Sequence, residues 1–104
     1  MPFPPKRDHR IPLAAAAAMT KRYRDEATGA ETAQMFPREV IETLLSQPGA
    51  FGTRFYFGRE AAGGPIRLVA VAVDSQGNDL AGGEIIDFGF PCPPWCSGDN
   101  QLNS

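Results

Sequence analysis

The chain of 104 residues is poor in the residues that build metal and catalytic sites, with one histidine, His9, and two cysteines, Cys92 and Cys96. Two cysteines cannot form the multi-disulfide framework of a small secreted domain, and a closed zinc site needs more ligands than one chain supplies. A single histidine in a proline-rich segment leaves no convincing Ser/His/Asp or Cys/His set for nucleophilic catalysis. We therefore predict no catalytic residues, and an enzyme is the less favoured class.

Long apolar runs are also lacking, since none approaches the ~18–20 residues that span a bilayer. The nearest feature is the basic segment KRDHR followed by IPLAAAAAM, which has the outline of a signal peptide. Asp8 interrupts its basic part, Pro12 lies inside its apolar part, and alanine is only weakly hydrophobic. We expect a cytoplasmic protein with no membrane partner.

The net charge of −2 is small but unevenly distributed. Residues 1–24 contain six Lys/Arg and one acid, whereas the remainder contains four Arg and eleven acids. A basic arm of this kind can contact nucleic acid. Here Lys21 and Arg22 lie four residues before Asp25 and Glu26, the spacing of ion pairs on a solvated helix face. We therefore expect no nucleic-acid partner.

Two helices are predicted in the N-terminal half. Pro12 suits a first helical turn, the following alanines favour helix, and Thr28 and Gly29 end it. Its apolar positions recur at helical spacing: Ala16, Met19, Tyr23 and Ala27. Residues 29–35 are expected to form a loop. A second helix begins at Pro37 and carries one apolar face made of Val40, Ile41, Leu44 and Leu45.

Three strands are predicted after the helices, at residues 51–59, 66–74 and 83–90. Gly77 and Asn78 suit a hairpin turn with positive φ better than a calcium loop.

The predicted fold class is α+β, with an antiparallel sheet of about three strands covered on one face by the two N-terminal helices. The expected core is Leu44, Leu45, Phe55, Leu68, Val71 and Ile86. Val69, Val71 and Val73 need a cover on the other face, either the C-terminal tail or a second copy.

We divide the chain into an extended arm (1–10), one α+β domain (11–91) and a cysteine-containing tail (92–104). The segments KRYR, LLSQPG, FGTRFYFG, VAVDSQGND and PCPPWC occur in this order along the sequence. In this combination, residues 11–102 resemble a group of small uncharacterised bacterial proteins with a C-terminal PCPPxC motif. The resemblance implies no activity, because none is known for that group.

Cys92-Pro-Pro-Trp-Cys96 permits three interpretations. The tail is structural, with Trp95 and the cysteines packed on the sheet; or two chains share a zinc ion through Cys92 and Cys96; or the cysteines form a redox pair. Since two prolines hold the segment extended, we expect separate thiols. A bond between the sulfurs would overturn this expectation and place the redox pair first among the three interpretations.

The function predicted from the sequence is a non-catalytic binding or interaction module without a bound cofactor, which self-associates as a homodimer or binds an unidentified protein partner. The alternative is a thiol-based redox or zinc-binding protein that uses Cys92 and Cys96.

Overall fold

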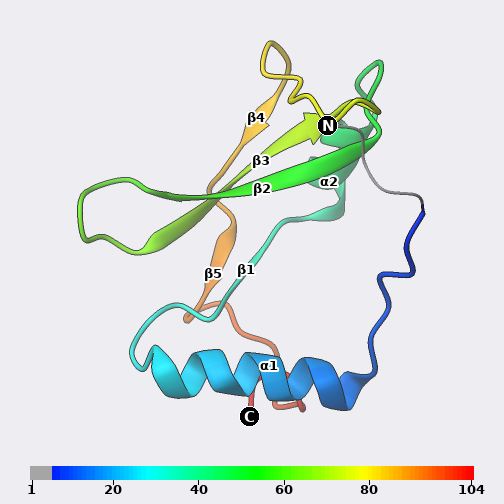
Figure 1. The fold of residues 1–104 in the computed structure, drawn as a ribbon. Helices are drawn as coiled ribbons and strands as arrows, with labels where there is room; N and C mark the ends of the chain where they lie inside the picture. Colours follow the sequence, from blue (N-terminus) through cyan, green and yellow to red (C-terminus); the bar gives the residue numbers. More distant parts are fainter. Residues whose placement is uncertain (1–5) are drawn as a thin grey trace.

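The structure is a computed structural model that describes residues 6–104 (Figure 1). In chain order its elements are α1 (Leu13–Glu26), β1 (Ala33–Met35), α2 (Arg38–Leu45), β2 (Gly52–Arg59), β3 (Ile66–Val73), β4 (Ile85–Ile86) and β5 (Phe90–Cys92). They form two antiparallel sheets, one of order β2-β3-β4 and one that pairs β1 with β5. The α+β class and the three-stranded antiparallel sheet are therefore confirmed. Of the predicted arm, residues 1–5 lie outside the described part, and residues 6–12 have no helix or strand.

β2 and β3 form the long hairpin at the centre of the molecule, paired over eight residues each from Gly52↔Val73 to Arg59↔Ile66. After β3 the chain reverses in the predicted turn, where Asp74 Oδ1 accepts hydrogen bonds from the backbone N–H groups of Gln76 and Asn78 at 2.9 and 3.0 Å. Gly77 in this turn has φ +88°, which a residue with a side chain rarely adopts. The hairpin-turn interpretation is confirmed.

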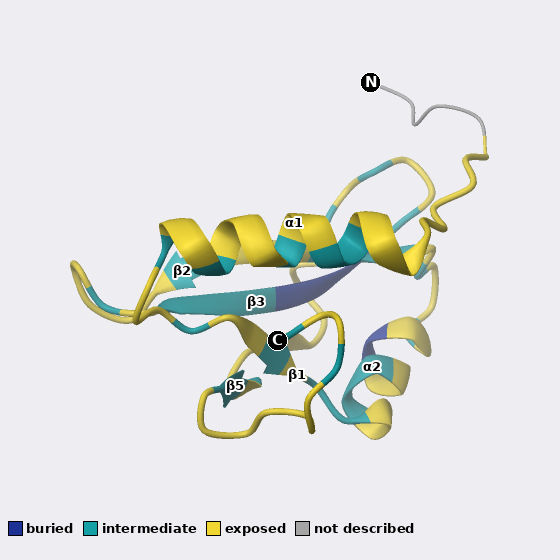
Figure 2. Cartoon of the chain, turned by 90° about the horizontal axis from the view of Figure 1, so that it is seen from below, coloured by how far each residue is buried: buried dark blue, intermediate teal, exposed yellow. Residues whose placement is uncertain are grey.

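The core lies where α2 contacts β2 and β3. Leu44 of α2 is fully buried, as are Ala70 and Ala72 of β3, and Figure 2 shows the buried positions concentrated on these elements. Phe36, just before α2, lies 6.1 Å from Phe55 between ring centroids, which places α2 on the side of the sheet that Phe55 faces. We call this side the α2 face.

The core is smaller than the sequence predicts. Leu44 and Val71 are buried, Leu68 and Ile86 are half-buried, and Leu45 and Phe55 are 47% and 43% exposed. The prediction is wrong for Leu45 and Phe55. The reason is geometric, because one helix of eight residues covers only one end of a hairpin of this length.

The opposite face of the hairpin is closed by neighbouring side chains rather than by the tail. Val71 and Val73 are 3% and 4% exposed within the single chain. Arg54 and Tyr56 share this face by strand parity, and Asp79, which bridges to Val73, accepts hydrogen bonds from both. The expectation that the tail or a second copy is needed to cover this face is therefore wrong for Val71 and Val73, whereas Val69 is half-buried.

α1 lies apart from the three-stranded sheet, at the far end of the molecule beside the C-terminus (Figure 1). None of its residues is buried. Arg24 fastens it to the tail by donating hydrogen bonds of 2.6 Å to the backbone oxygens of Leu102 and Ser104. The predicted covering of the sheet by two helices thus has support from α2 alone. Within residues 6–104 no helix is long and apolar enough to cross a membrane.

The chain has a second sheet where the sequence predicts loop and tail. Ala33–Met35 pairs with Phe90–Cys92, and we call this pair the β1–β5 ribbon. The predicted third strand is correspondingly divided, with Ile85–Ile86 in the main sheet and Phe90 in the ribbon. Gln34 joins the two sheets, because its side chain donates to the Ile66 carbonyl at 2.8 Å and accepts from the Leu68 N–H at 3.1 Å.

Candidate functional site: the cavity beside the Cys92–Cys96 disulfide

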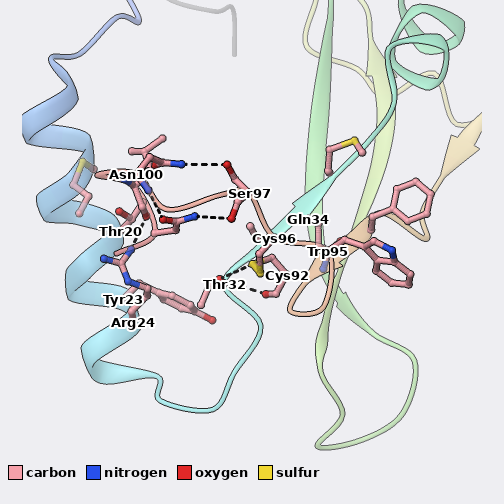
Figure 3. A pocket seen from close by; sticks show the side chains of 16 residues that line it. Thr20, Tyr23, Arg24, Thr32, Gln34, Cys92, Trp95, Cys96, Ser97 and Asn100 are labelled. Carbon is pink, nitrogen blue, oxygen red and sulfur yellow. Dashed lines mark hydrogen bonds between the residues drawn. A yellow bond between two sulfur atoms is a disulfide. The ribbon is translucent and has the colours of Figure 1, made fainter.

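A cavity of about 900 Å³ lies between α1, the β1–β5 ribbon and the C-terminal tail. We call it the disulfide cavity. Its apolar lining consists of Met19, Tyr23, Ala33, Met35, Phe90, Trp95 and Leu102, with the Cys92–Cys96 pair in the wall. Thr20, Arg24, Thr32, Gln34, Ser97, Asn100 and Asn103 complete it. In Figure 3 the α1 side chains lie at one end and Trp95 at the other, with the disulfide between them.

Cys92 and Cys96 form a disulfide, with their Cα atoms 4.8 Å apart. The expectation of two separate thiols is wrong. The two prolines do not keep the segment extended, because the chain turns and the Trp95 N–H donates to the Pro91 carbonyl at 3.0 Å. This turn brings the second sulfur back to the first, which is the geometry a disulfide requires.

The two sulfurs differ in their surroundings. Cys96 is exposed, whereas Cys92 is half-buried in the ribbon. Thr32 holds Cys92 in place: its N–H donates to the Cys92 carbonyl at 2.7 Å, and its hydroxyl lies 3.3 Å from the same carbonyl oxygen and 3.6 Å from Cys92 Sγ, so that its single proton can be donated to either atom. An incoming thiolate therefore has freer access to Cys96, and a negative charge left on Cys92 would be stabilised by a hydroxyl donor.

Trp95 stands on the ribbon and not on the main sheet, so the predicted packing of Trp95 on the sheet is wrong. Its ring meets Phe90 edge-on, with centroids 5.5 Å apart and planes at 66°. It remains 61% exposed. An exposed tryptophan supported by another aromatic ring is a typical anchor for a bound apolar group, because it offers a large rigid area at low entropic cost.

Hydrogen bonds organise the tail beyond the disulfide. Asn100 donates to the Ser97 hydroxyl at 3.2 Å, and Asn103 donates to the carbonyls of Ser97 and Gly98 at 3.3 and 3.1 Å. Among the described residues of the lining, Arg24 is the one charged side chain, and each of its terminal nitrogens donates to a tail oxygen. Apart from this guanidinium, the cavity presents apolar area and neutral polar groups.

The predicted zinc ligands Cys92 and Cys96 are bonded to each other, and a disulfide sulfur is not a thiolate ligand. Within residues 6–104 no cluster of three or more His, Cys, Asp and Glu side chains could hold a metal ion. Zinc binding stays a prediction that concerns only the reduced chain.

A second polar cluster lies outside the cavity, on the hairpin face opposite α2. Asp79 accepts hydrogen bonds from the Tyr56 hydroxyl and from Arg54, and these bonds lower the pKa of its carboxyl group. The same bond to Asp79 raises the pKa of Tyr56, and Asp79 raises that of Arg54. Arg54 also donates to the Gly77 carbonyl at 3.2 Å, so the cluster ties the hairpin to the turn after β3.

No protein-family model, curated protein or solved structure matches this chain. The resemblance of residues 11–102 to small bacterial proteins with a PCPPxC motif therefore stays a prediction. Of the cavity residues, sequence reasoning singled out Cys92, Trp95 and Cys96. It missed Thr32 and Met35, because β1 is three residues long and has no recognisable alternation. A usable signal was the apolar pair Met35-Phe36 directly before the helix-starting Pro37.

Proposed function

We propose that this chain is a small non-catalytic binding module that takes an uncharged apolar peptide segment of a protein partner into the disulfide cavity. The observation that carries the proposal is the cavity itself, which is large, lined mainly by apolar side chains and open to solvent beside Trp95. Its volume falls within the ~300–1,000 Å³ typical of ligand pockets.

The side chains of the lining determine which peptide segments the cavity can bind. Met19 and Met35 are 60% and 54% exposed, and thioether side chains adapt their shape to different apolar partners. Tyr23, Phe90 and Trp95 add aromatic area. Since Arg24 already donates to two tail oxygens, an acidic ligand would have to compete with the tail for these donors, and a basic ligand would meet a like charge. An uncharged segment with phenylalanine or leucine at its centre fits best.

Trp95 is the sole tryptophan and reports directly on the site. A blocked, uncharged peptide with a central phenylalanine should change Trp95 fluorescence in a saturable way, and the same peptide with a central aspartate should not. Met19→Lys, which puts a charge at the cavity, should weaken binding about tenfold or more. Ile11→Lys is the matched control, because Ile11 is similarly exposed (56%) and lies outside the lining. Equal binding by both variants would refute the proposal.

A second candidate function, thiol–disulfide exchange, is favoured by the bond between Cys92 and Cys96. A thiolate of a dithiol substrate attacks Cys96 Sγ, a mixed disulfide forms there, and Cys92 leaves as a thiolate. The substrate's second thiolate then attacks the mixed disulfide and releases Cys96. The substrate dithiol is oxidised to a disulfide, and the Cys92–Cys96 pair is reduced to a dithiol.

The unequal exposure of the sulfurs gives this candidate a specific test. Incubation of the oxidised chain with a monothiol in excess, followed by acid trapping and peptide mass analysis, should place the adduct on Cys96. Thr32→Val removes the hydroxyl beside Cys92 Sγ and should slow opening of the disulfide. Thr43→Val is the control, since the Thr43 hydroxyl donates to the Glu39 carbonyl within α2 and does not line the disulfide cavity. A disulfide that resists small thiols in the folded chain would exclude exchange.

The disulfide also bears on the proposed cytoplasmic location. Disulfides in the cytoplasm of mesophilic cells are usually transient and catalytic or redox-sensing, whereas static ones occur in oxidising compartments. A cytoplasmic protein with this bond therefore accords with exchange, and a permanently oxidised tail accords with an exported binding module. Alkylation of thiols at the moment of cell lysis, with the fraction of oxidised Cys92 measured by mass, separates the two.

A further inference from the structure

The outer edge of β2 is a long strand edge with which no other strand pairs within the described residues. β2 stands at the end of the order β2-β3-β4 and pairs with β3 along all eight of its residues. Natural proteins protect such edges with proline, lysine, bulges or a covering segment, because unpaired backbone groups there recruit another strand. β2 has the sequence GTRFYFGR, which contains neither proline nor lysine.

The backbone groups on this edge can be identified from the register. The Ile66 carbonyl and Leu68 N–H bond to Gln34, and the Ala72 carbonyl accepts from Leu80, so the even-numbered groups of β3 point away from β2. Its odd-numbered groups face β2, where they are partners of even-numbered residues. The N–H and C=O groups of the odd-numbered residues of β2 therefore lie on the outer edge: Thr53, Phe55 and Phe57.

The side chains at this edge are aromatic and exposed. Phe57 is 82% exposed and Phe55 43% exposed, and both lie on the α2 face by strand parity. Tyr56 on the opposite face is 45% exposed. A strand that offers free backbone hydrogen-bonding groups together with exposed aromatic side chains can satisfy both with a second strand.

The chain has a larger accessible surface area than a compact monomer of its mass. Its accessible surface is 7934 Å², whereas a compact monomer of 11.2 kDa has about 5,700 Å². Its radius of gyration is 15.6 Å against about 13 Å for a compact domain of this length. Residues 6–12, which form no helix or strand, and the separate α1 account for part of the excess.

We propose that two copies of this chain pair antiparallel through the outer edges of β2, with Phe55 of each opposite the partner's Phe57. The two-fold axis passes at Tyr56, and the two three-stranded sheets become one continuous sheet. This inference concerns a surface separate from the disulfide cavity and does not depend on the proposed binding function.

Charge and packing favour this register over the two registers whose axis lies one residue earlier or later. With the axis at Tyr56, Arg54 lies opposite the partner's Gly58 and Arg59 opposite the partner's Thr53, so no arginine faces another. All four edge phenylalanines are paired, an arrangement that stabilises sheets through cross-strand aromatic contact. An axis at Phe55 would leave Phe57 opposite threonine, and an axis at Phe57 would set Phe55 opposite arginine.

Association should stop at two copies, because the other edge of the sheet is not a second template. β4 is two residues long, and the Gln34 side chain occupies the edge groups of β3 beyond it. Within residues 6–104 the three-stranded sheet thus provides one long open edge. Antiparallel pairing of like edges closes a dimer.

Sedimentation velocity of the full chain over a range of concentrations tests the proposal. The wild type should sediment as a dimer of 11.2 kDa chains, and Phe57→Lys should weaken the dimer about tenfold or more. Ile85→Lys is the matched control, because Ile85 is 51% exposed on the opposite edge strand, and it should leave the dimer intact. Circular dichroism of both variants checks that the fold persists, which the exposure of both positions favours.

Amide hydrogen exchange tests the register. The N–H groups of Phe55 and Phe57 should gain protection as the concentration rises, while that of Tyr56, which faces β3, should be protected at all concentrations. A monomer at every soluble concentration, a dimer that survives Phe57→Lys, or open-ended assembly would each overturn the proposal. A dimer whose Phe55 and Phe57 amides exchange freely would overturn the edge as its site.

Discussion

Replacing Leu44 by alanine tests the core most sharply, because Leu44 is the largest side chain that is fully buried in the described part of the chain. Leu→Ala at a buried site costs about 2–5 kcal/mol, through lost transfer free energy and the cavity left behind. A small domain has a total free energy of unfolding of about 5–15 kcal/mol, so the loss is a large share of it. α2, at eight residues, is too short to persist without this contact.

Leu45→Ala in the same helix is the matched control. Leu45 is 47% exposed, so about half of the ~1.5–3 kcal/mol gained by burying a leucine is at stake, which is about 1 kcal/mol. Urea unfolding followed by far-UV circular dichroism gives both values from the midpoints, provided that the slopes are unchanged. Equal losses for the two variants would refute the assignment of Leu44 to the core and of Leu45 to the surface.

Three further predictions follow from single contacts. Because the pKa of Asp79 is lowered in the folded chain, its carboxylate stabilises the fold at pH values above the ordinary pKa of 3.8, and this stabilisation is lost as the pH falls through the lower folded-state pKa. Asp79→Asn should therefore make the urea midpoint depend less on pH in the acid range. An unchanged dependence would contradict this. Arg24→Gln removes the anchor to Leu102 and Ser104 and should speed amide exchange in α1 but not in β3. The double replacement of Cys92 and Cys96 by serine should cost at most about 2 kcal/mol, the loop-closure value for so short a loop, and should leave the circular dichroism of the core intact.

Local periodicity predicted the central elements from the sequence. The apolar face of residues 38–45 marks the side of α2 on which Leu44 is buried, the alternation of residues 52–59 marks a strand, and Gly77 supplies the positive φ of the turn. These signals come from residues that are close together in the sequence. For that reason the predicted helix, strand and turn agree with the structure.

Long-range pairing could not be predicted in the same way. β1 and β5 are three residues each and lie more than fifty residues apart, so neither has a period to detect. The disulfide depends on a turn whose closing bond, from the Trp95 N–H to the Pro91 carbonyl, cannot be seen in composition. The position of α1 away from the sheet follows from the length of the hairpin and from Arg24's bonds to the tail. The alanine-rich stripe of α1 predicted the helix correctly, but the structure gives no support for the prediction that this helix covers the sheet.

The binding of an uncharged apolar peptide in the disulfide cavity is tested most directly by nuclear magnetic resonance of the ¹⁵N-labelled chain. Titration with the blocked phenylalanine-centred peptide should move the Trp95 indole N–H signal and the amide signals of Tyr23 and Thr32, which line the cavity. The amides of Ala70 and Val71 in the buried strand should stay in place. Spectra that do not change at saturating peptide, or changes confined to β2 and β3, would contradict the account.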